Sequence, residues 1–254
     1  MTNYQMTKLY GLIGKKLSHS FSPAYFDDKF KKLGLDAEYR LFELDDISKF
    51  PELLKKYPDL KGLNVTVPFK IEVLPFLNEL DEIARQTGSV NTIQIKIKNG
   101  KAVLKGFNTD VFGFEQTLFP LIENRKGIKA MILGTGGSAA AVAFILDKLG
   151  IEFISISRNP VHPKQINYSE ITKEILEDYK LIIQTTPLGM FPQVQNSPPI
   201  SYDLLGKNHI LYDLIYNPSE TLFMKQGKQN GALGINGLQM LEIQAEASWK
   251  IWNK

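Results

Sequence analysis

The segment at residues 64–70 combines side chains that would suit a hydroxylated ligand and a proton transfer. Its first four residues, Asn-Val-Thr-Val, alternate polar with apolar and predict a short strand over 64–67. Pro68 cannot donate to a sheet ladder, so it should end the strand and leave Lys70 just beyond its tip. Because lysine is rarely buried, the simpler interpretation of Lys70 on its own is a solvated loop residue.

Other polar residues precede predicted helices or follow predicted strands. Ser18 and Ser20 flank His19 ahead of a helix start, where hydroxyls and backbone N–H groups can hold a carboxylate, although turn and cap roles are simpler. Adjacent residues point apart and no Gly-x-Ser-x-Gly elbow occurs, which argues against a Ser–His nucleophile pair. Asn91 lies in a Ser-Val-Asn-Thr stretch, and Asp110 either contributes to a site or caps the next helix.

A glycine-rich loop follows an apolar strand predicted at residues 129–133 and opens an alanine-rich helix. Gly134, Gly136 and Ala139 fit the Gly-x-Gly-x-x-Ala pattern. In that pattern the first glycine permits a tight turn, the second lets a pyrophosphate approach the backbone, and the small third residue lets helix pack on strand. The helix N-terminus offers N–H groups to phosphates, so we predict a dinucleotide site, with a ligand-free turn as the alternative.

The end of the next strand, at residues 152–157, indicates which dinucleotide binds. An NAD site carries an acid about 20 residues after the glycines, whereas this chain has Ser157, Arg158 and Asn159. Arg158 is one of only four arginines, and a guanidinium matches a 2′-phosphate bidentately. We therefore predict NADP, with a solvated turn arginine as the alternative.

Composition excludes several other classes of protein. The chain has 254 residues, 43% hydrophobic and 22% charged, a formal charge of +3, no cysteine and three scattered histidines. This composition predicts a globular chain of one large or two modest domains, without disulfides or a zinc site. No run approaches the ~18 apolar residues of a membrane span, and no basic run with interleaved aromatics supports a nucleic-acid surface. The expected location is the cytoplasm.

Periodicity predicts α/β architecture throughout. In the first ~105 residues, strands are expected at 8–13, 37–44 and 64–67 and helices at 22–33, 47–56 and over most of 71–87, with a hairpin of 89–97 and 101–106 across Asn99-Gly100. A helix at 111–118 then leads into parallel strands at 129–133, 152–157, 181–185 and 210–214, the pattern of a doubly wound nucleotide domain. A loop is expected at 187–199 and a last helix at 237–252.

The motifs, in this order, resemble the shikimate dehydrogenase family. The segments that carry the resemblance span nearly the whole chain and lie at residues 18–23, 64–70, 88–92, 106–110, 134–139, 185–190, 212–218 and 236–241. The resemblance implies reversible, NADP-dependent interconversion of 3-dehydroshikimate and shikimate in aromatic amino-acid biosynthesis. Residues 25–28 depart from the family's usual His-Asn, and 157–159 differ from its usual Asn-Arg-Thr.

The resemblance also assigns roles by position. It makes Lys70 and Asp110 the catalytic pair and Ser18 and Ser20 the binders of the substrate carboxylate. It implies further substrate ligands at Asn64, Thr66, Asn91, Tyr216 and Gln244. It implies a cofactor site formed by Gly134, Gly136, Gly137, Ser138, Ala139, Ser157, Arg158, Asn159, Thr185, Leu214 and Gly237, and no metal.

The expected domains follow from the same resemblance. Residues 1–106 form an N-terminal α/β substrate-binding domain, completed by the C-terminal helix at 237–254, and residues 107–236 form a Rossmann-type NADP-binding domain. The protein is expected to be a monomer or homodimer. Two alternatives stay open: a quinate/shikimate dehydrogenase that uses NAD, which the missing acid after the second strand disfavours, and a ligand-sensing homologue without catalysis.

Overall fold

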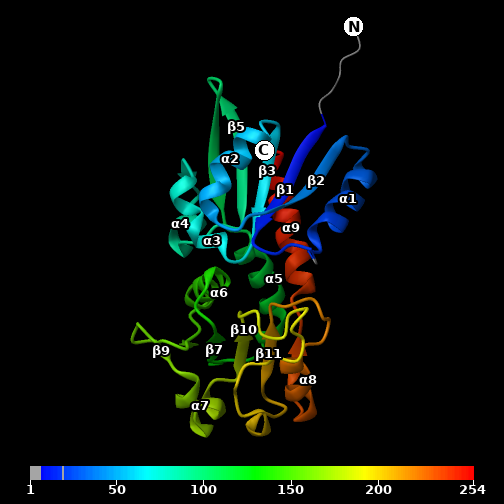
Figure 1. Ribbon diagram of the computed structural model, residues 1–254. Coiled ribbons are helices and arrows are strands. Elements are labelled where there is room, and N and C mark those ends of the chain that lie inside the picture. Colours follow the sequence, from blue (N-terminus) through cyan, green and yellow to red (C-terminus); the bar gives the residue numbers. More distant parts are fainter. Residues whose placement is uncertain (1–6, 19) are drawn as a thin grey trace. The chain divides into compact units, whose positions relative to one another are not determined.

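The computed structural model describes residues 7–18 and 20–254, which form two compact units (Figure 1). Unit 1 is Met1–Thr109 with Ala245–Lys254, and unit 2 is Asp110–Gln244. The sequence puts the two boundaries at 106 and 237. In the structure the first unit's main segment ends at Thr109, and the second boundary follows Gln244, within helix α9 (Leu238–Trp252). His19 lies outside the described residues. Within the described ranges, no helix is both long and apolar enough to cross a membrane.

Unit 1 contains a mixed six-stranded sheet in the order β2-β1-β3-β5-β6-β4. Strands β1, β2 and β3 are parallel, whereas β5 runs antiparallel to β3. The ends of β1 and β3 therefore lie at the same edge of the sheet as the start of β5. The strands are β1 (Lys8–Gly14), β2 (Ala37–Glu43), β3 (Leu60–Val65), β4 (Glu79–Leu80), β5 (Thr92–Lys98) and β6 (Lys101–Phe107).

Helices cover both faces of this sheet. On one face, α1 (Ser22–Leu33) and the end of α9 pack on β1 and β2 through Phe26, Tyr10 and Trp252. The other face is covered by shorter helices, which bury residues such as Phe50 and Phe69. Those helices are α2 (Phe50–Lys56), α3 (Phe69–Glu72) and α4 (Glu82–Thr87), with single 3-10 turns at Ile47–Lys49 and Leu74–Phe76. The C-terminal helix thus packs back on the first unit, as expected.

Several predicted boundaries in unit 1 were wrong. Strand β3 ends at Val65, because the chain turns at Val67 and Pro68, where the Phe69 N–H donates to the Thr66 carbonyl at 2.9 Å. The segment at 71–87 is broken by β4, and β5 starts at Thr92, three residues later than expected. The Asn99-Gly100 turn is confirmed, since both residues have positive φ, at 51° and 74°.

Unit 2 contains a six-stranded sheet in the order β12-β11-β10-β7-β8-β9, and every pairing is parallel. Helix α5 packs on one face, where Phe114 meets Tyr212, and α7 and α8 pack on the other through Leu176 and Phe223. The strands are β7 (Ala130–Leu133), β8 (Phe153–Ile156), β9 (Gln165–Ile166), β10 (Leu181–Gln184), β11 (Ile210–Asp213) and β12 (Leu233–Ile235). The doubly wound prediction is confirmed.

The helices of unit 2 differ from the sequence expectation in two ways. Helix α5 continues four residues past Leu118 and contains Pro120, whereas the periodicity predicted an end near residue 118. Helices α7 and α8 and the two short strands β9 and β12 had no clear signal in the sequence. The helices are α5 (Asp110–Ile122), α6 (Gly137–Lys148), α7 (Lys173–Asp178) and α8 (Leu222–Gln229), with 3-10 turns at Tyr168–Glu170 and Tyr202–Leu204.

Gly62 should be required for packing α9 on the sheet of unit 1. A Cβ at this position would overlap the indole of Trp252, whose Nε1 donates to the Ile93 carbonyl at 3.0 Å. We expect Gly62→Ala to lower the free energy of unfolding of unit 1 by about 1–3 kcal/mol. Tryptophan fluorescence in a urea titration measures this, because both tryptophans lie in unit 1. The exposed control Lys31→Ala should stay within about 0.5 kcal/mol of wild type; an equally small effect of Gly62→Ala would contradict the packing argument.

Candidate active site

The loop after β1 carries Ser18 and Ser20 at the edge where β1 and β3 end. The backbone N–H of Leu17 donates to Glu43 Oε1 at 2.7 Å, and Ser20 N–H donates to the Leu17 carbonyl at 2.9 Å. Ser20 Oγ accepts the Ser22 N–H at 3.3 Å, so this hydroxyl also shapes the turn into α1. Phe21 is the N-cap residue of helix α1, which begins at Ser22 as predicted. Ser18 is exposed and Ser20 half-buried, so both hydroxyls are accessible from the loop.

Lys70 lies in a short helix that follows directly from the end of β3. Thr66 N–H donates to the Ile13 carbonyl at 2.9 Å, which joins the ends of β3 and β1. Gly14 makes this approach possible, because a Cβ there would lie 2.6 Å from Thr66 Cγ2. Phe69 is 2% exposed and anchors α3 in the core. Lys70 is half-buried, and its carbonyl accepts the Val90 N–H at 2.8 Å, so it is held in a helical turn rather than in a solvated loop.

Asn64 and Asn91 are buried at the same edge. Asn64 is the last but one residue of β3 and Asn91 immediately precedes β5. The two are joined by their backbones, since Val65 N–H donates to the Asn91 carbonyl at 2.8 Å. Their amides bond to Tyr39, Thr109 and Ser248, among others. The motifs in the sequence assign no role to these three residues; the only signal is a hydroxyl at position 248 on the predicted last helix, four residues after Gln244.

The structure therefore brings the predicted site residues of unit 1 to one edge of its sheet. We call this the polar edge, formed by Ser18, Ser20, Asn64, Thr66, Lys70 and Asn91. The three other residues predicted to act in catalysis or substrate binding belong to unit 2. Asp110 is the first residue of α5 and 6% exposed, Tyr216 follows β11, and Gln244 lies on α9, the latter two half-buried.

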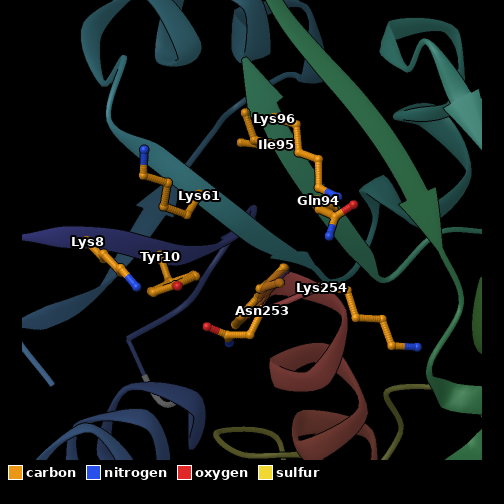
Figure 2. Close-up of a pocket in the computed structure, with 9 residues that line it drawn as sticks. Lys8, Tyr10, Lys61, Gln94, Ile95, Lys96, Asn253 and Lys254 are labelled. Carbon is orange, nitrogen blue, oxygen red and sulfur yellow. The ribbon is translucent and has the colours of Figure 1, made fainter. Parts of the chain in front are cut away.

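A hollow of about 270 Å³ lies at the opposite edge of the same sheet (Figure 2). It adjoins the starts of β1 and β3 and the middle of β5, and Lys8, Tyr10, Lys61 and Lys96 are among the residues that line it. It is therefore separate from the polar edge. In the part of the chain that the structure describes, no three His, Cys, Asp or Glu side chains gather as a metal site would require.

The glycine loop of unit 2 has the geometry of a dinucleotide site. Gly134 has φ +120°, and a Cβ there would lie 2.6 Å from Thr185 Oγ1, which bonds the Leu133 carbonyl at 2.7 Å. Gly136 caps the N-terminus of α6, and a Cβ there would meet no atom of the described part of the chain within 4 Å. The space above Gly136 is open to a ligand at the helix N-terminus, so these residues fit a pyrophosphate.

The turn after β8 presents Arg158 at the carboxyl edge of the same sheet. Its carbonyl accepts from Asn167 Nδ2 at 2.9 Å, and Asn159 N–H donates to Ser157 Oγ at 3.1 Å. The turn is therefore tied by hydrogen bonds, while the Arg158 side chain is exposed. A fixed backbone with an exposed guanidinium suits recognition of a phosphate.

The loop after β11 is fixed by a buried carboxylate. Asp213 is fully buried, and accepts from Ile215 N–H at 3.0 Å and from Thr221 Oγ1 at 2.6 Å. Gly237 donates its N–H to the Ile215 carbonyl at 3.0 Å, and a Cβ on Gly237 would overlap the Leu214 carbonyl. Burial raises the pKa of Asp213 to about 7, and the two donors offset only part of that shift. These contacts hold Leu214 at the carboxyl edge of the parallel sheet.

Unit 2 is a parallel doubly wound sheet with an open glycine loop at its switch point, and unit 1 carries the polar edge. Together they define the class of protein as a dinucleotide-dependent oxidoreductase. A profile of the shikimate dehydrogenase substrate binding domain matches residues 12–93. The chain is 38% identical to the NADP(+) shikimate dehydrogenase of Caldanaerobacter subterraneus subsp. tengcongensis, over 97% of this chain and 91% of the relative. This chain belongs to the shikimate dehydrogenase family, which confirms the resemblance found in the sequence.

Solved structures agree with this membership. Shikimate 5-dehydrogenase from Thermus thermophilus, in complex with NADP(H) and shikimate, matches with a TM-score of 0.79 and 28% identity, over 96% of this chain and 92% of that one. Quinate dehydrogenase from Corynebacterium glutamicum, in complex with NAD, matches with a TM-score of 0.81 and 26% identity, over 97% and 93%. The two solved structures carry different dinucleotides, NADP(H) and NAD, on the same fold.

The raised pKa of Asp213 should make unit 2 less stable as pH rises. The folded carboxyl binds its proton more tightly than the unfolded one, whose pKa is near 3.8, so the unfolding free energy falls between about pH 4 and 7. The fall should reach up to about 4 kcal/mol. Calorimetric unfolding across this range measures it. Asp213→Asn should flatten the dependence, whereas the exposed control Asp203→Asn should not; a wild-type slope unchanged in Asp213→Asn would contradict the assignment.

Proposed function

We propose that this chain interconverts 3-dehydroshikimate and shikimate reversibly with NADP, in aromatic amino-acid biosynthesis. The observation that carries the proposal is the 38% identity to an NADP(+) shikimate dehydrogenase across 97% of the chain. The polar edge of unit 1 and the open glycine loop of unit 2 supply the two kinds of site that such a reaction needs. Unit 1 is proposed to bind the substrate and unit 2 the dinucleotide.

The proposed substrate contacts follow the chemistry of each side chain. Ser18 and Ser20 donate hydroxyl hydrogen bonds to the substrate carboxylate. The other proposed ligands carry an amide, an aliphatic hydroxyl or a phenol, and these groups suit the ring hydroxyls because such groups can donate or accept a hydrogen bond. Those ligands are Asn64, Thr66, Asn91, Tyr216 and Gln244.

Lys70 and Asp110 are proposed as the proton-transfer pair. Oxidation of a secondary alcohol releases the hydroxyl proton as the carbon gives up a hydride, and a positioned side chain must take that proton. Lys70 suits this step because α3 fixes its backbone while its side chain is half-buried. Asp110, an acceptor when ionised, would orient the hydroxyl and the lysine. NADP supplies the hydride chemistry when bound, and the protein aligns it with the substrate.

The proposed cofactor site lies at the carboxyl ends of the strands of unit 2. The glycine loop and the N-terminus of α6 would hold the pyrophosphate, through Gly134, Gly136, Gly137, Ser138 and Ala139. Ser157, Arg158 and Asn159 would bind the adenosine 2′-phosphate. Thr185, Leu214 and Gly237 follow β10, β11 and β12 at the same edge, where the nicotinamide half would lie.

Two other functions differ in measurable ways. A quinate/shikimate dehydrogenase using NAD would carry an acid for the ribose 2′-hydroxyl after β8, where this chain has Arg158. A ligand sensor without catalysis has no need of a proton-transfer pair, and this chain has both Lys70 and Asp110. We also propose a monomer or homodimer that acts in the cytoplasm without binding nucleic acid.

Initial rates of the purified protein on shikimate and on quinate, each with NADP and NAD, test the proposed function. We expect the highest kcat/KM with shikimate and NADP. A higher kcat/KM with quinate and NAD would favour the first alternative. Shikimate binding in calorimetry without turnover in any combination would favour the sensor.

Lys70→Ala should lower kcat by about 10²- to 10⁴-fold, the range expected for loss of a general acid–base, with a smaller change in the KM for shikimate. Steady-state rates at saturating NADP measure both. Lys8→Ala is the matched control, because Lys8 lies in the hollow at the opposite edge of the same sheet (Figure 2). Near-wild-type turnover in Lys70→Ala would remove Lys70 from the mechanism.

Arg158→Ala should raise the KM for NADP selectively, by about 10-fold or more, since a charge-assisted hydrogen bond to the 2′-phosphate is lost. The KM for NAD should change little, because NAD has no 2′-phosphate. Rates with each dinucleotide at saturating shikimate measure the ratio. Arg85→Ala, an exposed arginine of unit 1, serves as control. Equal effects on NADP and NAD would count against the phosphate contact.

A further inference from the structure

A buried cluster of hydroxyls and amides lies behind the polar edge of unit 1. Its members come from β2, β3, β5, the segments just before β5 and after β6, and α9, and each is at most 5% exposed. We call it the Asn64 cluster; it consists of Tyr39, Asn64, Asn91, Thr92, Thr109 and Ser248. Because water cannot reach these groups, their hydrogen bonds must be satisfied within the cluster or by what binds beside it.

The Asn64 amide can adopt only one orientation. Its Nδ2 lies 3.3 Å from the Asn91 backbone carbonyl, which accepts and never donates, so the nitrogen must face that group. The same Nδ2 lies 2.9 Å from Ser248 Oγ and 3.2 Å from Thr92 Oγ1, so its two protons are shared among three acceptors. Asn64 Oδ1 accepts from the Tyr39 hydroxyl at 2.8 Å. Beyond the cluster, the amide can therefore only accept.

The Asn91 amide is held in the opposite sense. Its Oδ1 lies 2.7 Å from the Thr109 backbone N–H, which only donates, so the oxygen must face the cluster. The hydroxyls of Thr109 and Thr92 lie 3.0 and 3.1 Å from the same oxygen. The outer end of the Asn91 amide is consequently Nδ2, which can only donate.

Ser248 and Tyr39 connect these amides to different parts of unit 1. Ser248 Oγ lies 2.7 Å from Thr92 Oγ1 and 3.2 Å from Thr109 Oγ1, so it joins α9 to both asparagines. Tyr39 stacks on Phe26 of α1, with ring centroids 4.5 Å apart, and burial keeps its phenol protonated by raising its pKa. The phenol proton is therefore available to Asn64 Oδ1.

We propose that Tyr39 and Ser248 are positioning residues of the substrate site. They hold the Asn64 amide in place directly, and Ser248 supports the Asn91 amide through Thr92 and Thr109, so that Asn64 is presented as an acceptor and Asn91 as a donor toward the ring oxygens. The proposal rests on the proposed function and adds the sense of each contact. An acceptor binds a hydroxyl but not a ketone oxygen, so Asn64 suits a hydroxyl that the reaction leaves unchanged. A donor serves a hydroxyl and a ketone equally, so Asn91 suits an oxygen that alternates between the two forms.

Tyr39→Phe and Ser248→Ala test the proposal, because each removes one hydroxyl and leaves both asparagines in place. We expect the KM for shikimate to rise about 5- to 10-fold in each, as for the loss of an aligned hydrogen bond, with less change in kcat and none in the KM for NADP. A merely structural defect would lower the folded fraction, and so kcat, without this selective change in KM. Tyr39→Phe keeps the ring stacked on Phe26, which guards against a variant that fails to fold.

Tyr10→Phe is the matched control. Tyr10 is buried in the same aromatic group and stacks on Trp252, but its hydroxyl faces the hollow at the opposite edge (Figure 2). It should leave the KM for shikimate unchanged. In the double variant Tyr39→Phe/Ser248→Ala, the KM should rise by less than the product of the single effects, since both act through the Asn64 amide.

The outcomes separate the two proposals. The positioning roles would be overturned if both single variants kept the wild-type KM for shikimate, or if the KM of the double variant rose by the full product of the two single increases. Activity of the wild-type protein on shikimate with NADP would still uphold the proposed function. A wild-type protein inactive on shikimate with NADP would overturn the proposed function, and the positioning proposal with it.

Discussion

The hydrogen bonds of the Asn64 amide hold together the elements that form the polar edge of unit 1. It bonds at once to a phenol on β2, a backbone carbonyl just before β5 and a hydroxyl on α9. A buried amide left without partners costs about 1–3 kcal/mol per group, so the three elements cannot shift independently without loss. The same bonds fix the end of β3, from which the chain continues into Thr66 and Lys70. Rigidity of this kind is what a site needs to hold reacting groups in one geometry.

In unit 2 the main constraint is different, because part of the backbone must stay open to a charged ligand. A side chain at position 134 would collide with Thr185 and would need a positive φ, whereas among residues 7–18 and 20–254 no atom lies within 4 Å of a Cβ built on Gly136. Asp213 fixes the neighbouring loop at the expense of a buried carboxyl. The unit therefore gives up some stability at neutral pH to hold Leu214 at the carboxyl edge of the sheet.

Sequence patterns predicted the elements well where periodicity and turn chemistry agree. The strands β1, β7 and β11, the Asn99-Gly100 turn and helix α1 were all predicted to within about one residue. The errors fall where tertiary contacts override local preference. The polar pattern at 64–67 predicted a strand, but pairing ends at Val65 because the chain turns there to set Phe69 into the core. The short strands β4, β9 and β12 have two or three residues each, too few for a periodic signal.

By itself, the sequence determined the class of fold, the family, the dinucleotide loop and the residue types at the polar edge. These depend on local periodicity and on motifs, and the residues of each motif lie within a few positions of one another. Only the tertiary structure decided how those residues are supported. Tyr39 and Ser248 are separated from Asn64 by 25 and 184 residues, and no local pattern links them. The sense of the two amides follows from which backbone group each one meets, and that is set by pairing between strands distant in the chain.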